Sequence, residues 1–494
     1  MRGKGRVIRT ANNQRPNIIL VSCREPYRHK RTSRDVVCER PAGGMVSALE
    51  PAMQKLGGVW VAWGDGSADR DFVDSEDKLW VPPEAPAYQL KRIWLTREER
   101  EKFYYGFANQ YLWPLCHMLI DALRFRRSFW EGYKAVNERF AMEVVKEIGE
   151  RPAIVWIQDY HFACAPRTIK RERPDVPISL FWHIPWPPWD IFRFCGQKRE
   201  ILECLLQCDQ IGFHLDRYCE NFLASAKECL GAKVRNHGCD VEYRGKCTSV
   251  KSFPIGIDFR MFNDIATSQK TLASIERLKK KYSLSGKKVG LGVDRLDYTK
   301  GIPEKLRALH IFFSRYPEFL ENFVFIQVLA PSRSKIQAYR NLSERVLQKI
   351  EELNIRFGTH KWKPIICINS SLDRESLVPF YRMADLMLIT PVQDGMNLVA
   401  KEYVACQVEG KGVLLLSEFA GAHEEMKHSV TVNPYDSEGV AEAVKRALEM
   451  PEEERKEKIR ASRDSTSKND VNFWLNSLME ELTTLVDAKT YAFE

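Results

Sequence analysis

The chain has 494 residues, 44% of them hydrophobic and 29% charged, so it can form more than one hydrophobic core. Because a single core rarely serves more than about 250 to 300 residues, two domains of similar size are expected. The formal net charge of +9 is small for this length and the basic residues are scattered, which argues against a nucleic-acid-binding protein and favours small phosphorylated anions as ligands.

No segment approaches the about 20 apolar residues of a membrane span, and residues 1–16 are basic and polar, without the apolar core of a signal peptide. We expect a cytoplasmic protein that does not bind membranes, with a mobile arm over residues 1–16. The 13 cysteines include no C-x-x-C pair and often lie in apolar segments, as packing residues do in a reducing compartment. Cys204 and Cys208 lack further ligands for zinc, so no bound metal is expected.

The first half of the chain contains buried strand-like runs that end in polar loops, where functional residues tend to lie. Residues 18–21 form such a run before Arg24, and Gly44 then begins a helix-like segment. Two similar runs cover residues 153–157 and 178–182. The polar residues that follow these two runs include Asp159, His161 and His183.

The second half alternates between strand-like and helix-like segments, which predicts a second parallel sheet. Its expected strands are residues 289–293, 323–329, 365–368, 386–389, 413–416 and 430–432. The apolar pattern over residues 471–488 predicts a terminal helix that docks on the rest of the protein. The expected organisation is a first domain over residues 17–253, a second over residues 254–470, and a segment over residues 471–494 that crosses back to the first domain.

Two sequence runs carry most of the functional information. The run GVDRLDYTKG covers residues 292–301, and the run DGMNLVAKE covers residues 394–402. Each follows an apolar strand-like stretch and precedes a helix-like one. In an open parallel sheet, both would lie at the edge where the strands end and where ligands bind. We expect the active site at this edge.

The chain has two nucleotide-type halves but no G-x-G-x-x-G dinucleotide fingerprint, which suits a sugar-nucleotide transferase better than a dehydrogenase. It resembles the trehalose-6-phosphate synthase family, which are retaining glycosyltransferases of family 20 with the GT-B fold, from about residue 17 to residue 485. The motifs that carry the resemblance are Gly43-Gly44, Leu112-Trp113-Pro114, Asp159-Tyr160-His161, His183-Ile184-Pro185, Arg295 to Tyr298, Lys300-Gly301, Asp394 to Glu402 and Asn433 to Asp436. The resemblance implies an α/β protein with two Rossmann-like domains that face each other across a cleft.

The implied donor is a nucleoside diphosphate glucose, with UDP-glucose as the first expectation. Its breaking bond leaves negative charge on the diphosphate, and Arg295 and Lys300 on one loop can supply a planar guanidinium and a point charge to meet it. A helix that begins near Asn397 adds backbone N–H donors and the positive end of its dipole. These groups can take the place of a metal, and no cofactor is expected.

The resemblance also assigns roles around the transferred glucose. It implies that Asp394 and the amides near Gly395 and Met396 hold the hydroxyls of this sugar, and that His183 approaches it. Glu402, which we expect in the first turn of the helix, would accept the ribose hydroxyls. The other residues expected to bind the donor are Gly44, Asn397, Leu398 and Val399. The expected catalytic set is Arg295, Lys300, Asp159, His183 and Asp394.

The implied acceptor is glucose 6-phosphate, bound by the first domain to give trehalose 6-phosphate. Arg24, Tyr104, Trp113 and Arg333 match the family's phosphate-binding positions, and two guanidiniums with a phenol and an indole can bind a phosphate directionally. Asp159 would orient the acceptor sugar. Retention of configuration fits a front-face route in which the leaving phosphate takes the acceptor's proton. We interpret Asp69-Arg70-Asp71, which imitates a D-x-D metal motif, as solvated surface.

The chain departs from the family pattern at several positions, and alternatives stay open. Cys23 stands where asparagine is common, Gln393 stands where arginine is common, and Arg24 to Tyr27 is similar to glucosylglycerol-phosphate synthases, which use glycerol 3-phosphate. Rival classes are a phosphorylase with bound pyridoxal phosphate and a non-catalytic sugar-phosphate-binding regulatory subunit. The retained charged residues of the two runs argue against the latter. The sequence fixes neither the nucleobase of the donor nor whether the chain forms a homo-oligomer.

Overall fold

The computed structural model describes residues 16–41 and 44–492, and the chain folds into two compact units. The first unit comprises Met1–Pro254 together with Trp474–Glu494, and the second comprises Ile255–Phe473. The predicted mobile arm lies outside the described residues except for Pro16. No helix in the described part of the chain combines the length and apolar character that a membrane span requires.

The first unit is built on a ten-stranded sheet in which β12 through β6 run parallel and short antiparallel strands flank them. Its strands, in sheet order, are β10 (Lys233–Arg235), β11 (Asp240–Tyr243), β12 (Lys246–Ser252), β9 (Gln210–Phe213), β8 (Ile178–Phe181), β7 (Ala153–Gln158), β1 (Asn17–Arg24), β4 (Val59–Trp63), β6 (Tyr88–Ile93) and β5 (Lys78–Val81). The strand order reverses between β1 and β7, which makes this pair the topological switch point. Arg24 and Gln158 end these two strands.

The helices of the first unit pack apolar faces against this sheet. In α4, the residues Trp130, Tyr133, Phe140 and Val144 recur at helical spacing and are buried, which is why this segment forms one long amphipathic helix. The helices are α1 (Gly44–Leu56), α2 (Arg97–Glu99), the π-helix η2 (Arg100–Leu112), α3 (Trp113–Cys116), α4 (Arg127–Ile148), α5 (Ala165–Glu172), α6 (Trp189–Phe192), α7 (Lys198–Leu205) and α8 (Asp216–Leu230).

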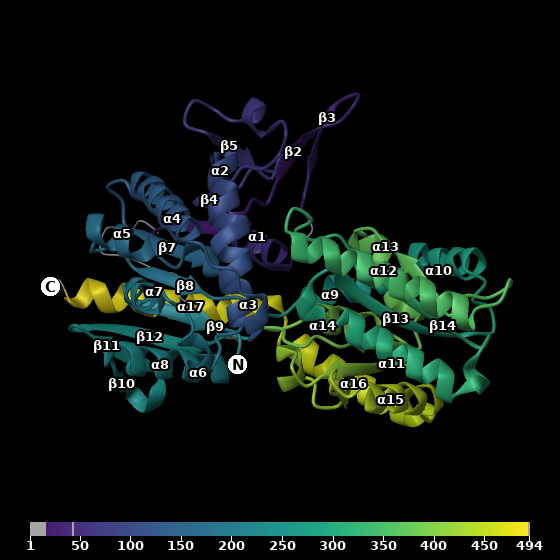
Figure 1. Ribbon diagram of the computed structural model, residues 1–494. Helices are drawn as coiled ribbons and strands as arrows, with labels where there is room; N and C mark the ends of the chain where they lie inside the picture. Colours follow the sequence, from purple (N-terminus) through teal and green to yellow (C-terminus); the bar gives the residue numbers. More distant parts are fainter. Residues whose placement is uncertain (1–15, 42–43, 493–494) are drawn as a thin grey trace, which may run out of the picture. The chain divides into compact units, whose positions relative to one another are not determined.

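The terminal helix α17 (Val471–Ala492) runs through the first unit (Figure 1), where its start lies beside β8. The ring of Trp474, which is only 1% exposed, lies 5.5 Å from Phe181 and 6.5 Å from Trp156. Leu478 and Leu482 are buried one and two turns further on. These contacts give the apolar face of the helix its partners.

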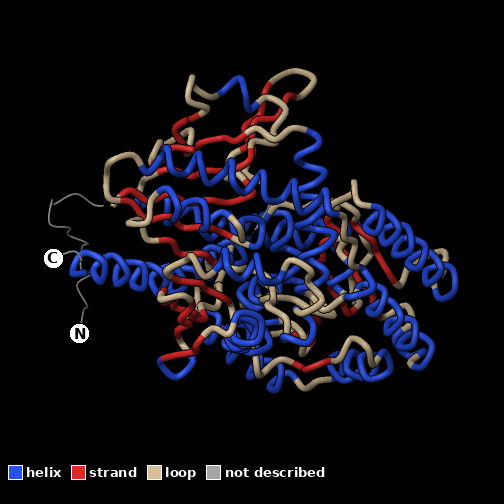
Figure 2. The backbone as a smooth tube through the Cα atoms, turned by 60° about the vertical axis from the view of Figure 1, so that its left-hand side comes forward, coloured by secondary structure: helices blue, strands red, loops and turns tan. Residues whose placement is uncertain are grey.

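The second unit is built on a six-stranded parallel sheet. Its strands, in sheet order, are β15 (Ile365–Ile368), β14 (Phe323–Ala330), β13 (Lys288–Arg295), β16 (Leu386–Ile389), β17 (Val413–Ser417) and β18 (Val430–Val432). Counted from β13, this is the order 3-2-1-4-5-6 of nucleotide-binding folds, and the switch point lies between β13 and β16. The predicted second parallel sheet is confirmed, and Figure 2 shows its strands among the surrounding helices.

The helices of the second unit form two neighbouring sets. In one set α11 contacts α12 and α15, and in the other α13 and α14 contact α9, and α14 also contacts α16. The helices are α9 (Phe259–Thr267), α10 (Gln269–Lys281), α11 (Ile302–Arg315), α12 (Gln337–Phe357), α13 (Arg374–Met383), α14 (Leu398–Cys406), α15 (Ser437–Glu449) and α16 (Glu452–Lys468), with the 3-10 turn η6 (Tyr298–Lys300) before α11.

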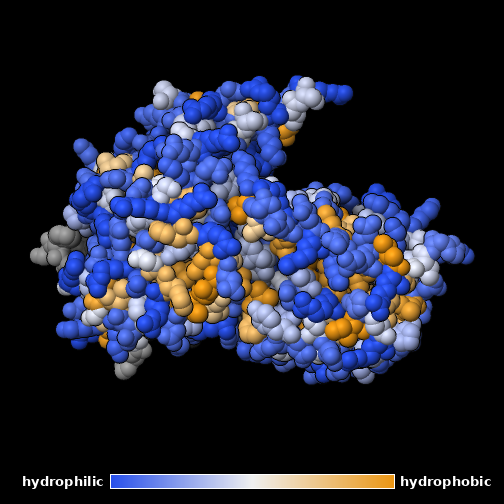
Figure 3. Space-filling model, viewed as in Figure 1, coloured by the Kyte–Doolittle hydropathy of each residue, from blue (hydrophilic) through white to orange (hydrophobic). Residues whose placement is uncertain are grey.

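The interpretation of Asp69-Arg70-Asp71 as solvated surface is wrong for its first residue. Asp69 is fully buried, and its carboxylate accepts hydrogen bonds from the backbone amides of Gly66 and His29 at 2.6 and 2.7 Å. The buried guanidinium of Arg92 lies 3.0 Å from it, and this cation from β6 is what allows the carboxylate to be buried. Arg70 and Asp71 are exposed, as is typical of the hydrophilic residues that dominate the visible surface in Figure 3.

Candidate active site

The two runs predicted to form the active site meet in the second unit. Strand β13 ends at Arg295, whose side chain is exposed, and the chain turns through η6 to Lys300. The Lys300 ammonium lies 2.5 Å from the Asp394 carboxylate in the loop after β16. Gly301 has a φ of 61°, and a Cβ there would lie 1.9 Å from the Thr390 carbonyl oxygen, so glycine is required at this turn.

The second run forms the start of α14, as predicted. Asn397 is the N-cap residue: its side-chain oxygen accepts from the Ala400 amide at 3.1 Å, and its amide group donates to Asp394 at 3.0 Å. Asn397 has a φ of 85°, a left-handed conformation that asparagine tolerates better than most residues. Leu398 and Val399 begin the helix, so their amides have no partner within it and lie at the positive end of the helix dipole. Asp394 therefore joins the cationic loop to the N-terminus of the helix.

From the sequence we expected Glu402 in the first turn of α14, and this prediction is wrong. The helix begins at Leu398, which places Glu402 in the second turn. There the Tyr381 hydroxyl donates to its carboxylate at 2.8 Å. Burial raises the pKa of Glu402 to about 7, although this hydrogen bond and the charge of Arg374 act in the opposite direction.

Asp297 is a site residue whose separate role the sequence pattern did not indicate. Its carboxylate is fully buried and lies 2.7 Å from the Arg333 guanidinium, which also donates to Tyr339 at 2.7 Å. Burial alone would raise the pKa of Asp297, but Arg333, Arg295 and Lys300 together hold it below its ordinary value. Asp297 thus fixes the direction of Arg333 from within the cationic loop.

Replacing Asp297 with asparagine is expected to lower the free energy of unfolding by about 1–3 kcal/mol at pH 7, because Arg333 loses its charged partner. The depressed pKa of Asp297 means that its stabilising contribution is present above pH 3.8 and is lost as the pH falls through its lower folded-state value. The variant should therefore lose less stability than the wild type on acidification below pH 3.8. Urea unfolding at pH 7 and pH 3 measures both effects, and Asp71→Asn, at an exposed position, is the matched control.

The first unit brings together two of the four residues expected to bind a phosphate. Arg24, at the end of β1, donates to the Tyr104 hydroxyl at 2.7 Å, and its guanidinium lies 5.3 Å from the centre of that ring. Tyr104 lies on the π-helix η2, a rare structure that often marks functional sites. Trp113 follows this helix and is buried against His117, and Arg333 belongs to the second unit.

Asp159 and His183 are close to each other at the carboxyl ends of β7 and β8. The backbone amide of His183 donates to Asp159 at 3.2 Å, and Asp159 has a strained φ of 74°. The His183 ring is bonded to the Gln158 side chain, with 2.8 Å between Nε2 and Oε1. Burial lowers the pKa of His183 well below its usual range, so its imidazole is neutral at pH 7. Gln158, which is fully buried, was not predicted as a site residue. Its position at the end of the apolar strand β7 is the sequence signal that could have indicated it.

Gly44, the remaining residue predicted to bind the donor, is the first residue of α1 and is exposed.

Comparison with known proteins identifies the family of this chain. The sequence model of Glycosyltransferase family 20 matches residues 16–484. The chain belongs to glycosyltransferase family 20.

Members of this family with related sequences and structures are known. The chain is 37% identical over 467 residues to alpha,alpha-trehalose-phosphate synthase [UDP-forming] A of Dictyostelium discoideum, and the match covers 94% of this chain but only 62% of that relative. A solved E. coli structure described as trehalose-6-phosphate bound with UDP-2-fluoro glucose is 30% identical, with a TM-score of 0.84 and coverage of 94% and 99% of the two chains. The alpha,alpha-trehalose-phosphate synthase (UDP-forming) of Burkholderia xenovorans, solved in complex with glucose-6-phosphate, is 29% identical, with a TM-score of 0.85 and coverage of 94% and 99%. The glycosyltransferase fold of the GT-B class is thus shown for this chain.

Proposed function

We propose that this chain is a retaining glucosyltransferase that moves glucose from UDP-glucose to glucose 6-phosphate, giving trehalose 6-phosphate and UDP. The observation that carries the proposal is the contact between Lys300 and Asp394, which joins a cationic loop to the N-terminus of α14 at the switch point of a nucleotide-type sheet. The UDP-forming relatives, and the solved relatives with a UDP-glucose analogue or with glucose-6-phosphate, support the choice of substrates.

In this proposal the second unit stabilises the leaving group. The bond between the anomeric carbon and the diphosphate oxygen breaks, and negative charge grows on UDP. Arg295, Lys300 and the first amides of α14 meet this charge, since preorganised donors are worth most where charge develops. Asp394, with the amides of Gly395 and Met396, holds the hydroxyls of the transferred glucose. The acceptor hydroxyl oxygen forms the new bond on the same face, and its proton passes to the leaving phosphate oxygen.

The residues of the first unit would hold the acceptor and approach the donor sugar. Arg24, Tyr104 and Trp113 would bind the phosphate of glucose 6-phosphate, with Arg333 of the second unit as a further cation, because phosphate suits charge-assisted hydrogen bonds from guanidiniums. Asp159 would accept hydrogen bonds from the acceptor sugar. A neutral His183, held by Gln158, can bond a hydroxyl of the transferred glucose without placing a positive charge near the reacting carbon.

A grid of substrates tests the proposal. UDP-, ADP- and GDP-glucose are each combined with glucose 6-phosphate and with glycerol 3-phosphate, and products are identified by NMR. We expect the highest kcat/KM for UDP-glucose with glucose 6-phosphate and retention at the transferred anomeric carbon. The glycerol 3-phosphate arm tests the alternative raised by Arg24 to Tyr27. Absence of transfer in every combination, with a folded protein that still binds sugar phosphates, would instead favour a regulatory subunit.

Donor binding is expected to depend on pH through Glu402. Because the pKa of this carboxyl is raised from 4.5 to about 7, it is protonated below that pH and ionised above it, and only the ionised form accepts two hydroxyl hydrogen bonds. KM for UDP-glucose should therefore fall as the pH rises through about 7. The same shift favours the folded protein below pH 4.5, and that contribution is lost as the pH rises to about 7. In Glu402→Gln, KM should be high and independent of pH across this range; a persisting pH dependence would contradict the assignment.

A further inference from the structure

A carboxylate lies between two arginines close to the end of β1. Asp65 Oδ2 is 3.3 Å from an Nη1 atom of Arg24, and Asp65 Oδ1 is 3.3 Å from an Nη1 atom of Arg28. The side chains of Asp65 and Arg28 are only 18% and 21% exposed, so this bridge is partly withdrawn from water. Two oxygens that each face a guanidinium have the arrangement in which two arginines hold a phosphate.

Both guanidiniums have another partner that keeps them in place without Asp65. Arg24 donates to the Tyr104 hydroxyl at 2.7 Å, and the Nε atom of Arg28, on the β2–β3 hairpin (Arg28–Arg31 and Val36–Glu39), donates to Glu39 at 2.9 Å. Withdrawal of the Asp65 carboxylate would therefore leave two oriented cations side by side. The phosphate-binding set predicted from the sequence did not include Arg28.

The backbone of Asp65 is held independently of its side chain. Its amide donates to Glu25 at 3.2 Å, and the other oxygen of Glu25 is 2.8 Å from the Arg92 guanidinium. Glu25 and Arg92 are 2% and 0% exposed, so the groups that hold this backbone are buried. The Asp65 side chain can thus rotate away about its own bonds while the loop stays in place.

We propose that Asp65 occupies the acceptor-phosphate position in the unliganded protein, and that Arg28 is a second guanidinium of that position. This inference rests on the proposed role of Arg24 in acceptor binding. An incoming phosphate displaces the carboxylate and binds Arg24 and Arg28 together. Because an incoming phosphate ester must displace the carboxylate and a neutral sugar need not, Asp65 lowers the affinity of this position for phosphorylated acceptors.

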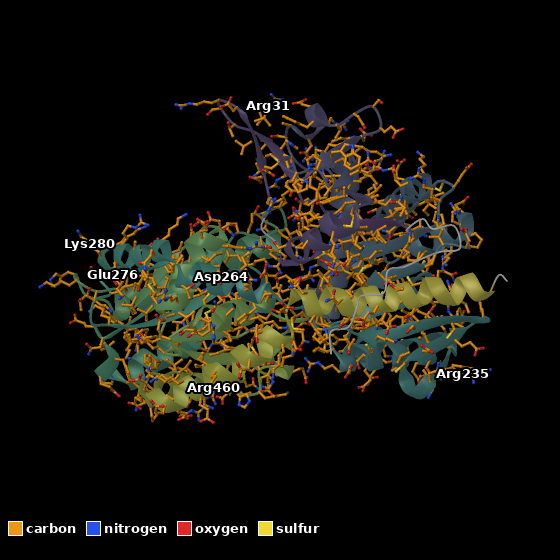
Figure 4. The ribbon with its side chains drawn as sticks, turned by 180° about the vertical axis from the view of Figure 1, so that it is seen from behind. Arg31, Arg235, Asp264, Glu276, Lys280 and Arg460 are labelled. Atoms are coloured by element: carbon orange, nitrogen blue, oxygen red, sulfur yellow. The ribbon has the colours of Figure 1, made fainter. Side chains whose placement is uncertain are left out.

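Calorimetric titration with glucose 6-phosphate, glycerol 3-phosphate and glucose tests this proposal. Asp65→Asn should bind both phosphate esters about two- to fivefold more tightly, since a partly exposed ion pair no longer competes. Arg28→Gln should bind both about tenfold more weakly, because charge-assisted hydrogen bonds are lost. Binding of glucose should not change in either variant. Asp71→Asn, whose partner Arg31 lies in the same hairpin and is 60% exposed, is the control with unchanged binding (Figure 4).

Weaker or unchanged binding of phosphate esters by Asp65→Asn, or unchanged binding by Arg28→Gln, would overturn the proposal. A folded Asp65→Asn that binds less tightly would show that Asp65 orients the arginines rather than competing for them. The test separates this inference from the proposed function. If the protein forms trehalose 6-phosphate but the Asp65 and Arg28 variants bind phosphate esters as the wild type does, only the proposed phosphate position is rejected. If the variants show the expected affinities but the protein transfers no glucose, only the proposed reaction is rejected.

Discussion

Replacing Arg295 with alanine is expected to lower kcat on the order of a hundredfold, which is the usual effect of removing a donor that acts in the transition state. Arg295 ends β13 at the switch point and is exposed there, at the edge where we expect the diphosphate to bind. KM for UDP-glucose should change much less than kcat, because charge on the leaving group is greatest in the transition state. Initial rates at saturating donor and acceptor measure both quantities.

Two further variants make this prediction specific. Arg295→Lys keeps the positive charge but loses the planar fork, so its kcat should lie between those of the wild type and Arg295→Ala. Arg315→Ala removes another exposed arginine of the second unit, at the far end of α11, and should keep normal turnover. A correctly folded Arg295→Ala protein with near-normal kcat would show that the leaving group is stabilised elsewhere.

The largest expected loss of stability follows from replacing Lys305 with methionine. The Lys305 ammonium is fully buried and lies 2.5 Å from the Asp294 carboxylate, which is 3% exposed and also accepts from Gln327 at 2.9 Å. Removing the cation leaves a buried carboxylate without its counter-charge, which costs about 3–5 kcal/mol. Urea unfolding of the full chain, followed by circular dichroism, measures the loss.

A second replacement tests whether the charge is the cause. In the double variant Lys305→Met with Asp294→Leu, both charges are absent, and most of the stability should return, because an apolar pair of similar size can replace a buried ion pair. Lys349→Met on α12 removes an exposed lysine paired with Glu352 and should change stability by less than about 0.5 kcal/mol. If the double variant were no more stable than Lys305→Met, loss of packing rather than the unpaired charge would explain the effect.

Sequence patterns predicted the framework of the fold because its central strands are continuous apolar runs. The strands β15 and β16 begin and end at the predicted residues, and the two functional runs, residues 292–301 and 394–402, lie at the ends of strands as expected. The antiparallel pair of β10 and β11 was not predicted. These strands are short and rich in polar residues, and pairing with a neighbour, rather than their own pattern, makes them strands.

The sequence by itself determined which residues could do the chemistry. The spacing of Arg295 and Lys300, and their position after an apolar strand, are local properties that a pattern can report. What only the tertiary structure decided is which charges are paired. Asp69 is buried because Arg92 reaches it from another strand, and Asp65 lies between Arg24 and Arg28 because β1 and β4 are neighbours in the sheet. Burial and pairing depend on the distances between residues far apart in the chain, and local sequence periodicity carries no information about those distances.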